Sequence, residues 1–346
     1  MTAAVGTAAR RPRSQHRRRG GRIAILVTAV LLPGALVASL AVGANPLSPD
    51  TVLATITGGG TAESHYVILE QRLPRTAAAV AVGAGLGAAG ALIQAFTRNP
   101  LADPGILGVN AGAAFFVAVG VGLWGMTDPV AHGWLACAGA LLAALAVQTI
   151  GTSRRGPAEP THLTMVGVAV GAVLSGLTTA LVLTHPQAFD HMRSWNAGSL
   201  LDRGFEVSLP LMPLIGLGLL GAVLMTPALN SMSLGADVAR AQGVAPHRLQ
   251  HLVLGCLTLL AGGATAIAGP IAFVGLMVPH VARWTWGTDQ RTIMTGSILL
   301  GALLMLLADV LGRLLVPGEM PVGLVTAFVG APVLIVLVRR RRASTL

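Results

Sequence analysis

Three arginines that stand at the ends of apolar runs are the first candidates for chemistry. Arg72 and Arg75 lie three residues apart, directly before one run, and Arg313 lies near the end of another. A guanidinium group binds a carboxylate through two parallel hydrogen bonds, so these arginines are suited to receive acidic groups of a partner protein. Asp309 precedes Arg313 by four residues, so on a helix the two could instead form a structural ion pair.

Catalytic and metal-binding chemistry finds little support in the sequence. His280 has no second histidine or carboxylate three or four residues away, which favours a hydrogen-bonded structural histidine. Neither an HExxH zinc motif nor a GxSxG nucleophile motif occurs. All 23 basic residues are arginine, so a P-loop lysine is missing and any ATP would have to be bound by another polypeptide. We therefore expect no enzymatic activity, no metal site and no cofactor on this chain.

The composition indicates which elements must position these groups. The chain has 346 residues, of which 53% are hydrophobic and only 10% are charged, with a mean hydropathy of +0.73. Soluble domains carry about 25% charged residues, so this composition predicts an all-α polytopic membrane protein. The net charge of +10 gathers in two arginine clusters beside apolar runs, as positive-inside anchors do. Contact with anionic lipid follows from that placement, and nucleic-acid binding does not.

Ten apolar runs predict about ten transmembrane helices in a domain that covers residues 23–338. Residues 1–22 are expected to form a disordered basic cytoplasmic tail, and residues 339–346 a second basic cytoplasmic tail. The run at 271–282 is too short to cross as a straight helix, so a broken or tilted segment is expected there. The expected spans are 23–42, 76–96, 105–124, 132–151, 163–184, 207–226, 250–268, 271–282, 292–315 and 321–338.

The distribution of arginine predicts that both termini lie in the cytoplasm. With ten spans, most arginines fall on the inner side, as the positive-inside rule requires. The outer segments then hold only Arg72, Arg75, Arg193, Arg203 and Arg313.

Small residues inside the runs predict a tightly packed bundle. Gly83 with Gly87 and Gly167 with Gly171 form GxxxG pairs, which allow helices in lipid to approach closely. These pairs indicate close packing and no particular chemistry.

The longest inner connection covers residues 227–249. Ser233 is a candidate cap for a short helix, and Gly243 is suited to end it. Such a helix between membrane spans is either a docking element for a cytoplasmic partner or a solvated connector.

Two further segments contain proline and glycine residues that favour the start or the end of a helix. In residues 98–105, Asp103 followed by Pro104 is a strong helix start, because the carboxylate caps and proline fits the first turn. The second segment, residues 269–283, is the expected broken span. The structural motif residues singled out in the two segments are Arg98, Asn99, Pro100, Asp103, Pro104, Gly269, Pro270, Gly275, Pro279 and His280.

These motifs, in this order, resemble the FecCD family of ABC importer permeases. The family pattern is similar to RLPR, then RNPLADPG, then GPI-x-FVGL-x-VPH-x-AR, then AD-x(3)-R, and finally E-x-PVG-x(2)-TA-x(2)-G-x-P. All of these are found here between residues 72 and 332. A departure is Gln242, where the family usually has leucine before the glycine of the coupling segment.

The resemblance implies a type II ABC importer permease fold in the bacterial cytoplasmic membrane. Such a subunit works as a homodimer or heterodimer, with the substrate path along the dimer axis, while ATP and Mg²⁺ are bound by cytoplasmic ATPase subunits. It also implies that Arg72, Arg75 and Arg313 receive glutamates of an extracytoplasmic substrate-binding protein. The implied coupling helix covers 234–244, and the implied cytoplasmic gate lies before the fifth helix. The candidate coupling residues are Leu234, Gly235, Ala239 and Gly243, and the candidate gate residue is Thr161.

Ferric siderophores are the expected cargo, since they are the commonest substrates of this family, and cobalamin and haem remain alternatives. A secondary transporter driven by ions is a competing hypothesis, but that class usually carries ionisable groups near the middle of the membrane. A receptor or scaffold without transport is a further alternative. The long inner connection and the outer arginines argue against it.

Overall fold

The chain folds into a bundle of helices, described here from a computed structural model. The structure describes residues 13–43, 45–152, 160–316 and 318–342. Within these ranges there is no β-strand. The expected all-α membrane architecture is therefore confirmed.

The first half of the chain supplies a long amino-terminal helix, a small lobe, the central helix and a group of three apolar helices. The π-helical turn η1 runs directly into α4, so the two form one continuous rod. The elements are α1 (Arg13–Ala41), α2 (Pro49–Ile56), α3 (Ala62–His65), η1 (Tyr66–Arg72), α4 (Leu73–Thr97), η2 (Pro104–Leu107), α5 (Val109–Gly122), α6 (Pro129–Thr152) and α7 (Pro160–Thr184).

The second half contains shorter and more often interrupted helices. α10 and α11 bend by 47° at their junction, and a π-helical turn, η3, joins α13 to α14. The elements are α8 (Pro186–Trp195), α9 (Phe205–Ser208), α10 (Met212–Leu224), α11 (Thr226–Ser233), α12 (Ala236–Ala241), α13 (Pro246–Leu257), η3 (Thr258–Gly262), α14 (Gly263–Ala268), α15 (Val274–Thr285), α16 (Gln290–Leu315) and α17 (Val322–Arg342).

Each expected apolar run contains a helix, although not every helix is long. Six helical stretches of the described chain are long and apolar enough to cross a membrane, or seven if α10 and α11 count as one span. α5 and α17 supply shorter apolar helices, and α15 has only 12 residues. α5 and α15 are shorter than the expected spans for a local reason. Irregular segments before each of these helices take up residues that would otherwise extend it.

The two basic tails differ from their expected boundaries. α1 begins at Arg13, inside the segment 1–22 that was expected to be disordered, and α17 continues to Arg342, inside the expected tail 339–346. Arginine is a good helix former, so a helix started in the membrane continues through the adjoining arginines. Residues 1–12 and 343–346 lie outside the described residues.

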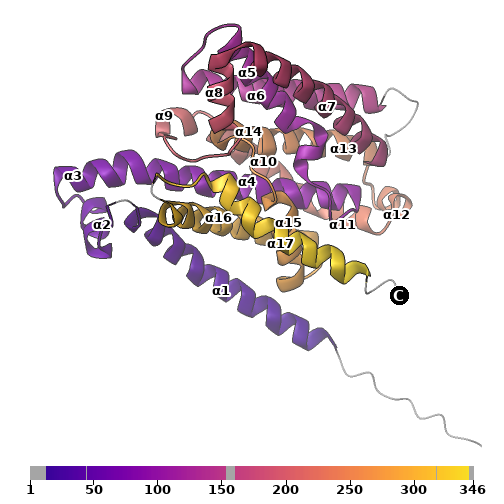
Figure 1. Ribbon diagram of the computed structural model, residues 1–346. Helices are drawn as coiled ribbons and strands as arrows, with labels where there is room; N and C mark the ends of the chain where they lie inside the picture. The colour runs from indigo at the N-terminus through magenta and orange to yellow at the C-terminus, as the bar shows by residue number, and fades with distance from the viewer. Residues whose placement is uncertain (1–12, 44, 153–159, 317, 343–346) are drawn as a thin grey trace, which may run out of the picture.

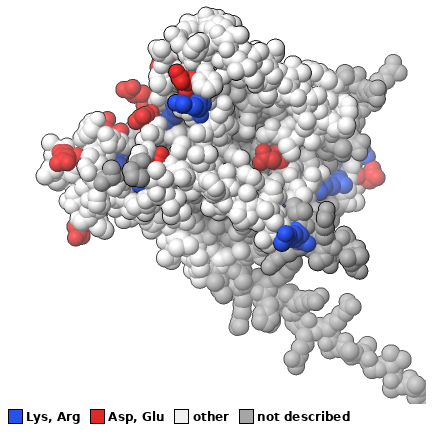
Figure 2. Space-filling view, viewed as in Figure 1, with Lys and Arg blue, Asp and Glu red and all other residues white. Residues whose placement is uncertain are grey.

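α4 lies at the centre of the bundle. Figure 1 shows α5, α6, α7 and α8 on one side of α4 and α1, α16 and α17 on the other. Most of the apolar stretch Ala62–Thr97 is buried, and its main partner is α16. One end of the bundle carries α2, α3 and α9, and the opposite end carries α12. Figure 2 shows charged side chains mostly toward these two ends, with an almost uncharged surface between them.

The glycines of α4 allow α16 to approach at backbone distance. A Cβ built on Gly83 would lie 2.3 Å from the carbonyl oxygen of Gly301, and one on Gly87 would lie 2.1 Å from that of Ser297. Real Cβ atoms do not come so close, so these positions require glycine. In the Gly167–Gly171 pair, only Gly167 is closely packed: a Cβ on Gly167 would lie 2.3 Å from the carbonyl oxygen of Ile106.

We predict that Gly83→Ala destabilises the folded protein by about 1–3 kcal/mol, because the methyl group would force two backbones apart. Gly216→Ala is the matched control, since a Cβ at this helical position meets nothing within 4 Å. That control should be neutral or slightly stabilising, by about 0.4–1 kcal/mol. Thermal unfolding in detergent measures both, and equal midpoints for the two variants would contradict the packing argument.

Candidate functional site

Arg72 closes the end of α1. Its Nη1 atom donates to the carbonyl oxygens of Leu40 at 2.7 Å and Ala41 at 2.8 Å, and its Nη2 atom donates to that of Asn45 at 2.5 Å. The last carbonyl groups of a helix have no partner within the helix, and they attract positive charge. Gly43 lets the guanidinium pass, because a Cβ there would lie 2.6 Å from Arg72 Nη2.

Arg313 reaches the same helix end from α16. Its Nη1 atom donates to the carbonyl oxygens of Ser39 at 2.7 Å and Val42 at 3.0 Å. Its Nη2 atom forms an ion pair with Asp309, one turn earlier on α16. Two arginines from distant parts of the sequence therefore satisfy the end of α1. The sequence alternative of an Asp309–Arg313 ion pair is confirmed.

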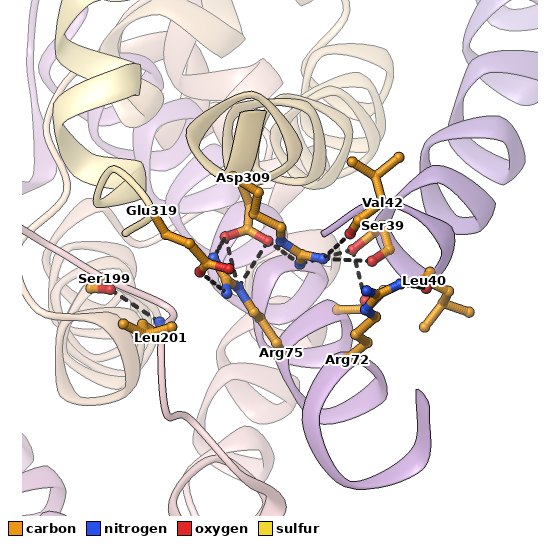
Figure 3. Close-up of polar contacts among 11 residues, drawn as sticks. Ser39, Leu40, Val42, Arg72, Arg75, Ser199, Leu201, Asp309 and Glu319 are labelled. Carbon is orange, nitrogen blue, oxygen red and sulfur yellow. Dashed lines mark hydrogen bonds and ion pairs between the residues drawn. The ribbon is translucent and has the colours of Figure 1, made fainter. Parts of the chain in front are cut away.

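Arg75 stands between two carboxylates (Figure 3). Its Nε atom donates to both oxygens of Asp309, at 3.0 and 3.1 Å, and its Nη2 atom lies 2.8 Å from Asp309 Oδ1. Its Nη1 atom lies 2.5 Å from Glu319 Oε2, in the connection from α16 to α17. Asp309 thus pairs with two arginines at once, and the network joins α1, α4, α16 and the connection that leads to α17.

The three arginines were expected to point toward a partner protein, and the structure corrects this for two of them. Arg72 is 7% exposed and Arg313 is 8% exposed, and both bind this chain's own groups. Arg75 also binds this chain's own carboxylates, but its partner Glu319 is 25% exposed. The sequence alone did not show that Arg313 binds the end of α1, because the ends of α1 and α16 are more than 270 residues apart. Glu319 was overlooked as a partner of Arg75; its place in the motif E-x-PVG was the available signal.

The network forms one wall of a hollow of about 600 Å³ at the end of the bundle that carries α2, α3 and α9. Arg72, Arg75, Arg313 and Glu319 line it, together with residues of η1, α9 and the segment before α6. Its charged lining residues are Glu70, Arg72, Arg75, Asp128, Asp202, Arg203, Glu206, Arg313 and Glu319. The hollow therefore mixes both signs of charge and is suited to a polar protein surface.

A histidine pair lies near this hollow. The ring of His191 in α8 meets the ring of His132 in α6 edge to face, with centroids 4.5 Å apart. Burial, followed by repulsion from His132 and Arg203, lowers the pKa of His191 to about 4. His191 is therefore neutral at pH 7, and it adds no positive charge to this end of the molecule.

At the opposite end of the bundle, α12 is the short helix expected within residues 227–249. Its beginning differs from expectation, because Ser233 belongs to α11 and donates to the carbonyl oxygen of Asn230 at 2.6 Å. Gly235, with φ 117°, is the cap residue instead. Gly243, with φ 82°, follows the end of the helix, as expected.

The outward face of α12 also differs from expectation. Ala239 is 0% exposed, so it packs inward and does not lie on a contact face for a partner. Leu234 and Val238 are the apolar residues left open, with 66% and 41% of their surface exposed. Gln242, the departure from the family pattern, accepts a hydrogen bond from Ser231 at 2.5 Å and ties α12 to α11.

Thr161 is the second residue of α7, at the expected fifth span. The loop before it, residues 153–159, and the Thr161 side chain lie outside what the structure describes. The expected gate role of Thr161 stays a prediction.

The segment 98–108 forms the expected turn. Arg98 ends α4 in the left-handed conformation, and Asn99 accepts from the backbone N–H of Leu101 at 3.0 Å. Asp103 caps η2 by accepting from Gly105 N at 2.8 Å, and Pro104 takes the first position of η2. The helix start predicted from Asp103 and Pro104 is confirmed, although the helix is a single 3₁₀ turn.

The broken span was also foreseen. Gly269, with φ 75°, ends α14 before Pro270, and α15 starts only at Val274. Gly275 packs against α4, and Pro279 lies within α15. His280 is buried with its ring edge-on to that of Trp284, at 4.7 Å.

Histidines one turn apart on α13 were missed in the sequence. The rings of His247 and His251 lie 4.4 Å apart, and the spacing is that of an HxxxH pattern. In the part of the chain that the structure describes, no group of three or more His, Cys, Asp or Glu could hold a metal ion. The pair is therefore not assigned a metal.

We predict that Asp309→Asn destabilises the protein by about 3–5 kcal/mol, because Arg75 and Arg313 would lose their shared buried carboxylate. Asp237→Asn is the matched control, since its ion pair with Arg240 is exposed and worth about 0–1 kcal/mol. Unfolding midpoints in detergent should separate the two variants clearly. A fully stable Asp309→Asn protein would show that the network is not a structural tie.

A multi-helix bundle with apolar spans and with charged side chains mostly at its two ends defines a multi-pass membrane protein. The FecCD transport family matches residues 30–340. The chain therefore belongs to the FecCD transport family, as its motifs suggested.

The relatives and a solved structure agree with this assignment. The chain is 45% identical to the ferric enterobactin transport system permease protein FepD of Escherichia coli K12, over 93% of this chain and 98% of the relative. It is 37% identical to the probable siderophore transport system permease protein YfiZ of Bacillus subtilis 168, over 92% and 94%. A metal-chelate type ABC transporter solved in an inward-facing conformation superposes with a TM-score of 0.82, at 27% identity, over 92% of this chain and 99% of that one. The expected ABC importer permease fold is confirmed.

Proposed function

We propose that this chain is the membrane subunit of an ABC importer that moves ferric siderophores into the cytoplasm, with ATP and Mg²⁺ bound by a separate ATPase. The observation that carries this proposal is the 45% identity to a ferric enterobactin permease over nearly the whole chain. Relatives named for ferric dicitrate and iron(3+)-hydroxamate import point to the same class of cargo. Cobalamin or haem is the alternative cargo.

An ion-driven secondary transporter is the weaker alternative. The Arg75–Asp309–Arg313 cluster lies at the outer end of the spans, and together with Glu319 its charges are paired within the chain, so it does not resemble a proton relay. Import that requires the ATPase and stops with vanadate supports the ABC mechanism. Import driven by a proton or sodium gradient without ATP would contradict it.

The orientation and the partners follow as parts of the same proposal. Both termini lie in the cytoplasm of a bacterium, a second permease subunit completes the path, and the substrate-binding protein docks at the opposite end. The arginine distribution supports this orientation, because α12 and the arginine-rich ends of α1 and α17 then share the inner side.

The cytoplasmic ATPase is proposed to seat on α12. Exposed apolar side chains are energetically costly in water, so Leu234 and Val238 on a solvent-facing helix suggest a covered surface in the assembly. A Cβ built on Gly235 would meet nothing within 4 Å, so a partner backbone can come near this residue.

We predict that Leu234→Asp combined with Val238→Asp uncouples the ATPase and lowers uptake about tenfold or more, because two apolar contacts are lost. Asp237→Ser is the matched control, since this neighbouring side chain is almost fully exposed. ATPase stimulation by the loaded binding protein and uptake are measured in liposomes. Normal coupling in the double variant would make α12 a connector only.

Docking of the substrate-binding protein is proposed at the outer hollow. Arg72 and Arg313 hold α1 in place there, which leaves Arg75 as the arginine whose partner, Glu319, is itself partly exposed. A carboxylate of the binding protein could approach Arg75 in the same manner as Glu319 does.

We predict that Arg75→Gln weakens docking on the order of tenfold, since a charge-assisted contact is lost, while Asp309 keeps Arg313 as its partner. Arg203→Gln is the matched control, because Arg203 lines the same hollow outside the RLPR motif. Binding of the loaded binding protein to the liposome-embedded transporter is measured at low and high salt. Unchanged binding by Arg75→Gln, or an equal loss in Arg203→Gln, would contradict a specific role of Arg75.

A further inference from the structure

Three irregular segments from distant parts of the sequence meet beside α4. They are 98–108 after α4, 196–199 after α8, and 269–273 between α14 and α15. The backbone N–H of Ser199 donates to the carbonyl oxygen of Ala268 at 2.8 Å, and a Cβ on Gly198 would lie 2.6 Å from that of Pro270. Pro104 in turn packs on Gly275, whose Cβ would lie 2.8 Å from it.

This meeting point lies within the membrane and not at its inner surface. A Cβ on Gly90 of α4 would lie 1.9 Å from the carbonyl oxygen of Gly275, so the two backbones touch. Gly90 precedes the inner end of α4, Thr97, by about 10 Å at 1.5 Å per residue. The segment 98–108 therefore turns back into the bundle after α4 has reached the inner side.

Polar side chains gather at this depth. A Cβ built on Gly105 would lie 3.0 Å from both Asp103 Oδ1 and Asn110 Nδ2, so glycine leaves space between the two groups. Thr265 donates to Asn110 Oδ1 at 3.0 Å, which turns the Asn110 amide N–H groups toward that space. Among the described residues, Asn110 Nδ2 has no hydrogen-bond partner.

Two adjoining hollows open onto these groups. Their volumes are about 350 and 410 Å³, and they share Asn110, Asn196 and Pro270 as lining residues. Asp103 lines one hollow, and Ser175 on the open face of α7 lines the other. Asn196 is exposed, and its side chain has no partner in the described part of the chain.

Such a hollow is unsuited to lipid. Within a membrane, polar side chains and non-helical backbone are tolerated only where protein or a water-filled cavity surrounds them. Interrupted helices near the middle of a transporter commonly form its substrate site. We propose that Asp103, Asn110 and Asn196 form a polar substrate-contact site in the translocation path, an inference that rests on the proposed import function.

The chemistry of the three side chains defines what they would recognise. The two carboxamides both donate and accept hydrogen bonds, and the carboxylate only accepts them. The site is therefore suited to the amide and hydroxyl groups at the surface of a ferric chelate. The single carboxylate repels negative charge, so it lowers the passage of a negatively charged ferric tris-catecholate relative to what the two carboxamides alone would allow.

The first test asks whether the site faces water. Cys137 and Cys256 are replaced by Ala, and Asn196→Cys is then introduced into the complete transporter in liposomes. A charged thiol reagent should label Asn196→Cys, with or without ATP and vanadate, but not Leu217→Cys, which lies exposed on apolar α10. Equal lack of labelling in both variants, with full labelling after unfolding, would overturn the proposal without reference to any substrate.

The second test measures uptake of radioactive iron as ferric enterobactin, ferric citrate and an iron hydroxamate. Asn196→Ala should lower maximal uptake about two- to tenfold, the worth of one hydrogen bond, while binding-protein docking stays unchanged. Asn196→Gln should recover part of it, and Gln187→Ala, an exposed carboxamide at the start of the same helix α8, should transport normally.

The charge selectivity of uptake is a measurement that would not change if Asp103 had a structural role only. Asp103→Asn keeps the cap oxygen for Gly105 N and removes the charge, so the ratio of negatively charged to neutral chelate uptake should rise. Unchanged rates in Asn196→Ala and an unchanged ratio in Asp103→Asn would overturn the site. If the wild-type transporter imports none of the three chelates, the proposed cargo fails, whereas thiol labelling still decides the inference.

Discussion

The constraint on which this structure depends is that a backbone carbonyl buried away from water must have a hydrogen-bond partner. The last residues of α1 are buried against other helices, so its final carbonyl groups would otherwise have no hydrogen-bond partner. Arg72 and Arg313 supply the missing donors from two directions. Because both side chains also carry charge, Asp309 is needed beside Arg313, and Arg75 shares that carboxylate. Helix capping, ion pairing and the placement of α1, α4 and α16 are therefore parts of one arrangement.

The same constraint explains the interior of the bundle. Where helices are interrupted at residues 98–108 and 269–273, the backbone is satisfied by short local bonds, such as that from Gly105 N to Asp103. The interruptions can approach α4 only because Gly90 and Gly275 carry no side chain. Close packing by glycine thus permits non-helical backbone in the membrane, and the polar groups that accompany it are what could meet a substrate. An apolar bundle without such breaks would offer a chelate no hydrogen bonds.

Much of the fold was predictable from the sequence, because hydropathy, proline and glycine act locally. Every expected apolar run contains a helix, and the capping role of Asp103 and the break at Gly269 follow from their immediate neighbours. The site was less predictable. Arg72 looked like a surface arginine, since nothing near it in the sequence shows that its partners are carbonyl groups of α1. Ala239 looked available on α12, whereas its burial depends on packing with the rest of the fold. Pairings across long separations were the part that local patterns could not provide.

The arginine network also explains why lysine would not replace arginine at these positions. Arg72 serves three carbonyl oxygens with two nitrogen atoms, and Arg75 bonds both oxygens of Asp309 while reaching Glu319. A planar guanidinium presents five donors in a fixed fork, whereas an ammonium group presents three around a single point. One lysine could neutralise Asp309, but it could not bridge two carboxylates on different segments with the same geometry. The two arginines of the RLPR motif are thus set three residues apart on one helical rod, so that one holds α1 and the other holds α16 and the start of α17.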